Sequence, residues 1–226
     1  MKYPYQRFPD YCWYNSIPYF GKWRSERESS TECLTDASRN CLRIGVLAPD
    51  FSLEGVLGGE KTKINISNQR GRWTVVFFYA SDFTFVWPTE LAAVAAKMNE
   101  FRRLNTVIFG ISTDSIYSHK IFTQVSPSGR KINFPLLSDR SQEVSKKYGV
   151  LNEKEGFTYR GTFMIDPEGG IQAIFIKPPS VGRNIDEIIR IVEALQYSKK
   201  TNLAIPANWK SGEPGIERDW NMVGKY

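Results

Sequence analysis

Two continuous runs of apolar residues, with a helical pattern between them, place the strongest constraint on the fold of this chain. Residues Trp73–Tyr79 and Thr106–Ser112 are rich in β-branched and aromatic side chains, as expected of strands that are buried on both faces. Between them, Pro88–Arg103 carries apolar side chains at helical spacing, with proline in the first turn that it favours. Strands of this kind need helices on both sides, so the order predicts an α/β domain.

The remaining segments continue the alternation of strand and helix. Gly58 and Gly59 are typical of a hairpin turn, and the turn Asp166–Gly170 predicts a second hairpin. The other expected elements are a helix capped by Asp114 or Ser115 and reaching Gln124, a helix capped by Asp139 or Ser141 and reaching Tyr148, hairpin strands at 161–165 and 171–176, and a last helix with Ile185, Ile188, Ile189 and Val192 on its apolar face. We therefore predict three layers, with a mixed central sheet flanked by helices.

Residues 1–43 differ in composition from the rest of the chain and are predicted to form an aromatic-rich N-terminal extension. Of the 31 aromatic residues (6 Trp, 11 Tyr and 14 Phe), nine lie within residues 1–23. Because disordered tails are poor in aromatic residues, we expect this segment to pack on a surface, either that of its own domain or that of a neighbouring subunit. The same division gives a main domain at 44–200 and a C-terminal tail at 201–226.

All three cysteines, Cys12, Cys33 and Cys41, lie within this extension. They form no Cys-x-x-Cys pair, and a zinc site made of cysteines alone lacks a fourth ligand from one chain. Since His119 is the single histidine and no glycine-rich phosphate loop is present, we expect neither a metal site nor a cofactor. The thiols are either reduced and partly buried or form an interchain disulfide, because an odd number in one extension leaves room for bonding between chains.

The charge and hydropathy of the chain exclude several classes of function. The formal net charge is +6, but the basic residues are scattered, which indicates a solvated surface and no nucleic-acid partner. No stretch approaches the about 18 apolar residues of a membrane span, and no signal peptide is recognised. We therefore expect no membrane insertion and a cytoplasmic protein by default, with assembly at a cell or spore surface left open.

Seven segments together resemble a known family. They are APDFSLEGV, DFTFVWPTEL, STDSIYSHKIF, NFPLLSD, YRGTFMIDPEG, VGRNIDEIIRIVEALQ and PANWKSGEPG, in this order between Ile44 and Ile216. The chain resembles the typical 2-Cys peroxiredoxins, also described as alkyl hydroperoxide reductases or thiol-specific antioxidant proteins. The resemblance implies the thioredoxin-like fold of these thiol peroxidases, and with it an assembly of dimers into rings, commonly decamers.

The resemblance also implies where an active site would lie. In this family a cysteine in the first turn of the helix attacks the O–O bond of a peroxide as a thiolate, aided by an arginine and a hydroxyl group. In this chain Thr84 matches the hydroxyl, Arg160 the arginine, and Glu90 the carboxylate that orients the arginine. The position of the attacking cysteine holds Trp87.

Two further positions depart from the family pattern. Ala80 stands where the family has a proline that shields the cysteine, and Ile205 stands where the second, resolving cysteine belongs. An indole has no ionisable proton near neutral pH and no lone pair suited to displacement at oxygen, so no catalytic residue is expected. We expect Thr84, Glu90 and Arg160 to remain as a structural hydrogen-bonded cluster.

The tryptophan at position 87 could also have an artificial or a translational origin. An engineered substitution of cysteine would place it there, but this leaves Ala80 and Ile205 unexplained. A recoded stop codon, in which selenocysteine is written as tryptophan, would place it there as well. The recoded codon would restore a reactive nucleophile.

The single histidine offers a different catalytic hypothesis. His119 lies near Ser118 and Asp114 in sequence, but no Gly-x-Ser-x-Gly elbow is present, and the Ser-His pair belongs to the segment that resembles the peroxiredoxins. We interpret His119 as a structural residue.

Three functions follow from these observations. The first is a catalytically inactive structural subunit that assembles with itself into rings, stacked through the N-terminal extension, with no small-molecule substrate. The second is a peroxidase that reduces hydrogen peroxide or alkyl hydroperoxides, with a selenocysteine at position 87 or a cysteine of the extension as its nucleophile. The third is a regulatory pseudoenzyme that binds a partner or an active relative. We favour the first.

Overall fold

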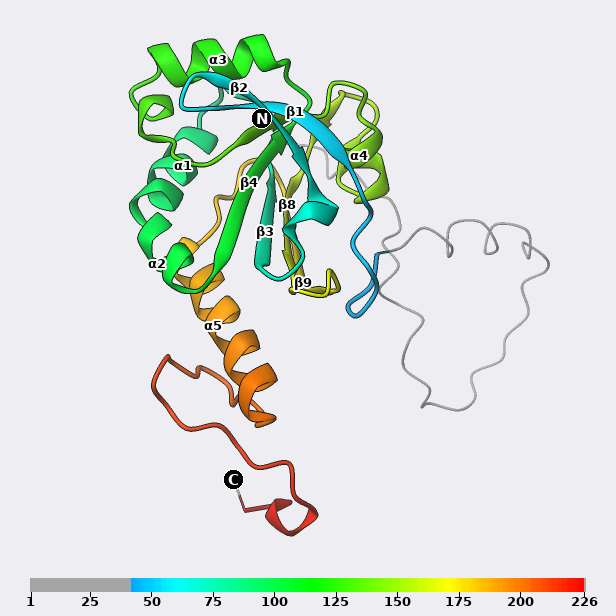
Figure 1. Ribbon diagram of the computed structural model, residues 1–226, viewed down its shortest axis with the longest axis vertical. Coiled ribbons are helices and arrows are strands. Elements are labelled where there is room, and N and C mark those ends of the chain that lie inside the picture. The colour runs from blue at the N-terminus through cyan, green and yellow to red at the C-terminus, as the bar shows by residue number, and fades with distance from the viewer. Residues whose placement is uncertain (1–41, 226) are drawn as a thin grey trace, which may run out of the picture. The chain divides into compact units, whose positions relative to one another are not determined.

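A seven-stranded mixed sheet, in the order β2-β1-β5-β4-β3-β8-β9, runs through residues 42–225, the part of the chain that the computed structural model describes (Figure 1). Its strands are β1 (Ser52–Leu57), β2 (Glu60–Asn65), β3 (Trp73–Phe78), β4 (Thr106–Ser112), β5 (Leu136–Ser138), β8 (Arg160–Ile165) and β9 (Ile171–Lys177), and β6 (Leu151–Asn152) pairs with β7 (Phe157–Thr158) apart from it. The helices are α1 (Trp87–Ala96), α2 (Met98–Arg103), α3 (Ile116–Val125), α4 (Glu143–Lys147) and α5 (Ile185–Thr201), with short 3₁₀ turns η2 (Ile66–Gln69), η3 (Gly129–Lys131) and η4 (Trp220–Met222).

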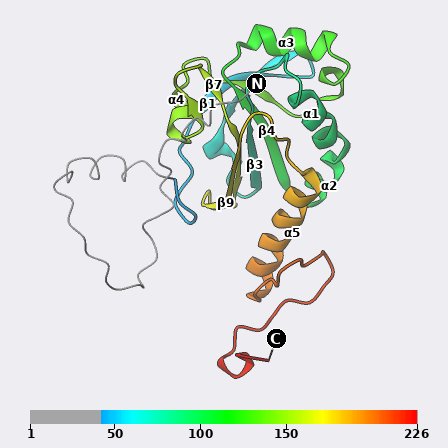
Figure 2. The same ribbon diagram turned by 180° about the vertical axis from the view of Figure 1, so that it is seen from behind.

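The two apolar runs form the centre of the sheet, as predicted. β3 and β4 pair in parallel, and every residue of β3 is buried. The side chains of β3 alternate between the faces. Val75 and Phe77 belong to the core that includes residues of α1, α2 and α5, while Phe78 packs against Tyr148 at the end of α4. Helices therefore cover both faces, with α1, α2 and α5 on one side and α4 on the other (Figures 1 and 2).

The predicted hairpins and the last helix are confirmed. β8 pairs antiparallel with β9, and β1 with β2 through Gly58 and Gly59, both of which have positive φ. The apolar face of α5 is buried at the four predicted isoleucine and valine positions. The two hairpins and the last helix were predictable because turn residues and apolar spacing specify them locally, and strand pairing and burial agree with this local preference.

The prediction of one helix over Pro88–Arg103 is wrong, because the chain forms two helices, α1 and α2, that meet at Lys97. The N–H of Lys97 donates to the carbonyls of Val94 and Ala95, and its backbone (φ −101°, ψ 5°) leaves the helical conformation for one residue. The predicted apolar stripe still reaches the core on both helices.

The caps of α3 and α4 differ in part from expectation. Ser115 caps α3, and its side chain accepts the N–H of Ser118. α4 starts later than predicted, after Gln142 in the left-handed region (φ 64°), but the Asp139 carboxylate still accepts the N–H groups of its first turn. Asp114 caps neither helix, since its carboxylate contacts the loop after β3.

The sheet ends in two edge strands, β2 and β9. β9 exposes Phe175 and Ile176 on part of its surface. No helix within residues 42–225 is both long and apolar enough to cross a membrane.

Candidate functional site

The site lies where β3 ends and α1 begins, joined by the loop 79–86. Trp87 is the first residue of α1, Pro88 follows it, and Glu90 lies in the same first turn. Val86 provides no side-chain cap, so the start of the helix is held by other contacts. The prediction that Trp87 stands at the mouth of this helix is confirmed.

The indole of Trp87 is fully buried in the core. It stacks on the Tyr79 ring with centroids 3.9 Å apart and planes 9° from parallel, and the guanidinium of Arg183 lies 5.4 Å from the indole centroid. Gly110 of β4 leaves room beside both rings. A Cβ at this position would lie 3.4 Å from Trp87 Cζ2, 3.4 Å from Tyr79 Cε1 and 2.9 Å from Leu136 Cδ2. Trp87 Nε1 is buried and has no hydrogen-bond partner among residues 42–225. Within this part of the chain, packing and the Arg183 guanidinium hold the side chain without a hydrogen bond.

A buried cluster of one carboxylate and two guanidinium groups lies in the first turn of α1. Arg160 Nη1 donates to Glu90 Oε2 at 2.6 Å, while Arg183 Nε and Nη2 donate to the two carboxylate oxygens at 2.9 Å each. Arg183 Nη1 also donates to the carbonyls of Phe78 and Gly161. Burial lowers the pKa of Arg160, and the Glu90 carboxylate opposes this shift. Glu90 thus joins α1 to the segments that carry both arginines.

The cluster confirms part of the predicted arrangement. Glu90 and Arg160 are hydrogen-bonded, as expected, but Thr84 is not a member, since its hydroxyl donates to the carbonyl of Ser81 at 2.9 Å. The reason is local, because Thr84 lies in the turn before the helix and reaches its own loop first. Arg183 is not predicted as a member of the site, although it lies in the Val-Gly-Arg-Asn segment before α5, which is one of the segments that resemble the peroxiredoxins.

The other predicted positions are separate from this cluster. Ala80 is half-buried in the loop directly after β3. Ile205 is half-buried in the C-terminal segment, next to the bridge between Ala204 and Ile216. Cys12, Cys33 and Cys41 lie outside the described residues.

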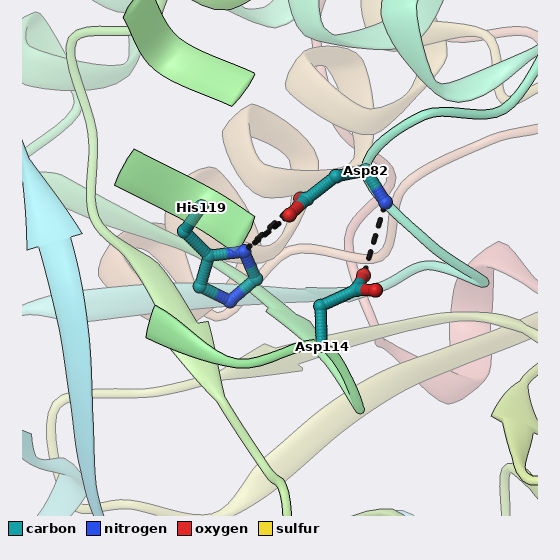
Figure 3. Close-up of side chains that lie close together, drawn as sticks. All are labelled: Asp82, Asp114 and His119. Carbon is teal, nitrogen blue, oxygen red and sulfur yellow. Dashed lines mark hydrogen bonds and ion pairs between the residues drawn. The ribbon is translucent and has the colours of Figure 1, made fainter. Parts of the chain in front are cut away.

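His119 belongs to a second buried network, centred on Asp82 (Figure 3). Its Nδ1 lies 2.9 Å from Asp82 Oδ2. The hydroxyl groups of Tyr79 and Ser118 donate to the same carboxylate at 2.9 and 2.7 Å. Asp114 does not pair with His119, so the Ser/His/Asp arrangement drawn from the sequence is not formed. His119 is buried and contacts the loop after β3 through Asp82, and its structural role stays an interpretation.

Asp82, Asp114 and His119 also have the composition of a metal site, with possible ligand atoms within 4.8 Å of one another. Donors of the chain already occupy both carboxylates. Asp114 accepts from the hydroxyl groups of Ser81 and Ser112 and from the N–H of Asp82. Hydrogen bonding therefore accounts for the arrangement, and we assign it no metal.

The fold defines a class of protein, the thioredoxin-like α/β domains, in which helices flank a mixed central sheet. Residues 44–174 match the AhpC/TSA family, and residues 194–226 match the C-terminal domain of 1-Cys peroxiredoxin. The chain belongs to the peroxiredoxin family.

Relatives cover most of the chain. Peroxiredoxin prdx-2 of Caenorhabditis elegans is 38% identical over 190 residues, which are 81% of this chain and 94% of the worm protein. Thioredoxin peroxidase of Fasciola hepatica is 41% identical over 169 residues, 72% of this chain and 86% of its own length. The name of the worm protein gives its family, and the name of the Fasciola hepatica protein describes a peroxidase.

Solved structures agree with the fold. The reduced 2-Cys peroxiredoxin of Plasmodium vivax superposes with a TM-score of 0.74 at 31% identity, over 78% of this chain and 93% of its own. AhpC of Enterococcus faecalis gives a TM-score of 0.71 at 32% identity, over 74% and 99% of the two chains. The predicted mixed sheet of the peroxiredoxin fold is thus confirmed.

Proposed function

We propose that this chain is a catalytically inactive peroxiredoxin that acts as a self-assembling structural subunit. The observation that carries the proposal is the fully buried indole of Trp87 in the first turn of α1. By the family resemblance this is the position of the attacking cysteine. An indole supplies no thiolate, and its stacking on Tyr79 fills the space beside the helix start.

The groups around Trp87 are held by contacts within the chain. The Thr84 hydroxyl donates to the loop backbone, and Arg160 and Arg183 both donate to Glu90. A charged group held by a buried partner is costly to separate from that partner. The cluster therefore serves to fix α1 against β8 and the segment before α5.

Self-assembly is supported by an exposed apolar strip on one end of the sheet. Tyr117, Ile121 and Val125 recur at helical spacing along α3 and are 76%, 49% and 54% exposed. Phe83 and Phe85 of the loop before α1 are 60% and 98% exposed, and the Phe83 ring contacts Phe122 of α3 with centroids 5.2 Å apart. We call the five exposed residues the apolar strip. Large exposed apolar side chains on one helix and on a loop that contacts it are typical of an interface, and a second copy of the chain is the occupant that the proposal requires.

The first test is peroxide turnover. With a thiol reductant supplied, purified protein is expected to consume hydrogen peroxide no faster than a heat-denatured sample, because Trp87 and Ile205 remove both redox thiols of the family. The rate is followed by the loss of peroxide. Thiol-dependent turnover above the denatured sample would refute the inactive assignment.

A companion variant for this assay is Trp87→Cys. We expect it to restore little activity, since Ala80 replaces the proline of the family pocket and Ile205 the resolving cysteine. An intact mass of the purified protein accompanies both samples and identifies the residue at position 87.

A second prediction concerns the apolar strip. The full chain is expected to elute from gel filtration at neutral pH as a ring-sized or larger species. The double variant Phe85→Asp with Tyr117→Asp is expected to elute later, toward the size of a dimer, because it places two charges inside the interface. Val223→Asp, at an exposed valine of the tail, is the control and leaves the elution unchanged. Elution of the wild-type chain as a stable monomer at micromolar concentration would contradict assembly.

A third prediction concerns the N-terminal extension. Deletion of residues 1–43 is expected to leave a folded, ring-forming core and to remove any stack or filament of rings, since the aromatic residues of the extension need a broad surface to bury them. Negative-stain microscopy of both chains is the measurement. Identical particles would show that the extension covers only its own domain.

A second candidate function is peroxidase activity, and the relatives favour it. Thioredoxin peroxidase of Fasciola hepatica bears that activity in its name, and this chain retains Thr84, Glu90 and Arg160. The candidate requires a nucleophile other than Trp87, either selenocysteine at that position or a cysteine of the extension. An intact mass that matches selenocysteine, or peroxide turnover that a Cys12, Cys33 or Cys41 substitution removes, would select it over the inactive subunit.

A further inference from the structure

Trp87 and Tyr79 form a buried pair of oxidisable rings. Both side chains are fully buried, and their rings are in van der Waals contact, nearly parallel, with centroids 3.9 Å apart. Tryptophan and tyrosine are the two side chains that lose a single electron most readily without a metal or thiol. Stacking overlaps their π systems, so the geometry favours rapid electron exchange between them.

The surroundings of Trp87 disfavour a long-lived positive charge on its ring. An oxidised indole normally relaxes by releasing the proton of Nε1, but Trp87 Nε1 is buried and has no acceptor among residues 42–225. The Arg183 guanidinium lies 5.4 Å from the ring centroid and repels an added positive charge. An indole radical cation at this position therefore remains a strong oxidant of its neighbour.

The surroundings of Tyr79 favour the opposite outcome. Its hydroxyl donates to Asp82 Oδ1 at 2.9 Å, so the phenolic proton has a carboxylate to move to when the ring loses an electron. Burial raises the pKa of Tyr79 well above its usual value, and the phenol therefore keeps that proton until oxidation. Asp82 is itself buried and is held in place by Ser118 and His119.

We propose that Trp87 and Tyr79 form a one-electron relay whose terminal site is Tyr79. An oxidant of the inorganic-radical class removes one electron from Trp87 and leaves its radical cation. Tyr79 returns an electron to Trp87, and its hydroxyl proton passes to Asp82, which gives a neutral tyrosyl radical and a protonated carboxyl group. One electron from a thiol or ascorbate, with return of the proton from Asp82, restores the resting state. The relay depends on tryptophan at position 87 and on neither assembly nor the lack of peroxidase activity.

A second tryptophan–tyrosine pair of the chain offers a matched comparison. Trp209 and Tyr197 lie with centroids 5.5 Å apart and planes tilted by 36°, so their overlap is poorer. Trp209 Nε1 donates to the carbonyl of Glu213, and the Tyr197 hydroxyl accepts the N–H of Gly215. Within residues 42–225, this pair combines the same two residue types without the parallel stack and without a carboxylate hydrogen-bonded to the phenol.

The relay is tested by flash photolysis of the full-length protein. A short ultraviolet laser pulse ejects electrons from tryptophan whether or not it is buried. Nitrous oxide converts the ejected electrons to hydroxyl radicals, and tert-butanol in excess consumes those radicals before they reach the protein. The absorption bands of the tryptophan radical and of the tyrosyl radical are then followed in time. The variants are Trp87→Phe and Tyr79→Phe, which keep a ring in each place, Asp82→Asn, and Trp209→Phe as the control.

Wild-type protein and Trp209→Phe are expected to show a fast phase in which tryptophan radical decays as tyrosyl radical appears. Trp87→Phe and Tyr79→Phe lose this phase, and Asp82→Asn slows it. In heavy water the wild-type phase is also slower, because a proton moves with the electron. A fast phase that survives in Tyr79→Phe, or one that Trp209→Phe removes and Trp87→Phe does not, would overturn the relay. Circular dichroism confirms that each compared variant is folded, and Tyr79→Phe, which loses one oxygen atom, keeps the test available if Asp82→Asn does not fold.

Discussion

Replacement of Trp87 by alanine is expected to lower the free energy of unfolding by about 3–5 kcal/mol, the range for loss of a large aromatic side chain from a core. The indole is fully buried and packs on Tyr79 and beside Gly110, which has no side chain that could move into the space left behind. The loss is measured by urea unfolding, followed by circular dichroism at one protein concentration, because assembly links stability to concentration.

Trp220→Ala provides the control for this experiment. Trp220 is 86% exposed in the C-terminal segment, and surface substitutions of this kind change stability by about 0.5 kcal/mol or less. If Trp87→Ala cost no more than Trp220→Ala, the indole would not be the packing element that the structure indicates. Trp87→Phe is expected to fall between the two, since a smaller ring keeps part of the stack.

Replacement of Glu90 by glutamine is expected to destabilise the chain by about 3–5 kcal/mol, as found when one partner of a buried ion pair is removed. The substitution keeps the shape of the side chain but leaves two guanidinium groups, those of Arg160 and Arg183, facing each other without a negative charge. Burial lowers the pKa of Arg160, and the coulombic effect of Arg183 lowers it further, so the two arginines repel. The same unfolding measurement applies.

Glu187→Gln is the matched control, because Glu187 forms a similar two-oxygen contact with one arginine on the surface. Arg190 Nε and Nη2 donate to its carboxylate at 2.6 and 2.7 Å, and the Glu187 side chain is 45% exposed. Exposed pairs of this kind contribute about 0–1 kcal/mol. Equal losses from Glu90→Gln and Glu187→Gln would show that the buried cluster gives no special stability.

The class of fold can be read from short segments. The apolar runs of β3 and β4 are long enough, and rich enough in β-branched residues, to indicate strands buried on both faces. The turn residues of the two hairpins require positive φ or a tight bend, which local sequence specifies. The break at Lys97 cannot be read in this way because the apolar stripe continues across it, so hydrophobic periodicity carries no sign of the interruption.

The candidate site is only partly predictable. The family resemblance places Trp87, Glu90 and Arg160, and the structure brings them into one neighbourhood together with Arg183. Thr84 is expected in the same cluster, but its hydroxyl is satisfied within its own turn. The contact between Tyr79 and Asp82 has no sequence signal, since residues three apart in a loop after a strand have no fixed relation until the loop is folded.

The succession of strands and helices and the amphipathic faces can be read from local sequence pattern. The tryptophan at the helix start and the lack of any cysteine beyond residue 41 are matters of residue identity. The contacts that these side chains make become visible only in the folded chain. Glu90 is followed 70 residues later by Arg160 and 93 residues later by Arg183, and the pairing of distant strands brings all three together. The stack of Trp87 on Tyr79 likewise depends on how α1 lies against the sheet, which buried packing fixes and local sequence does not.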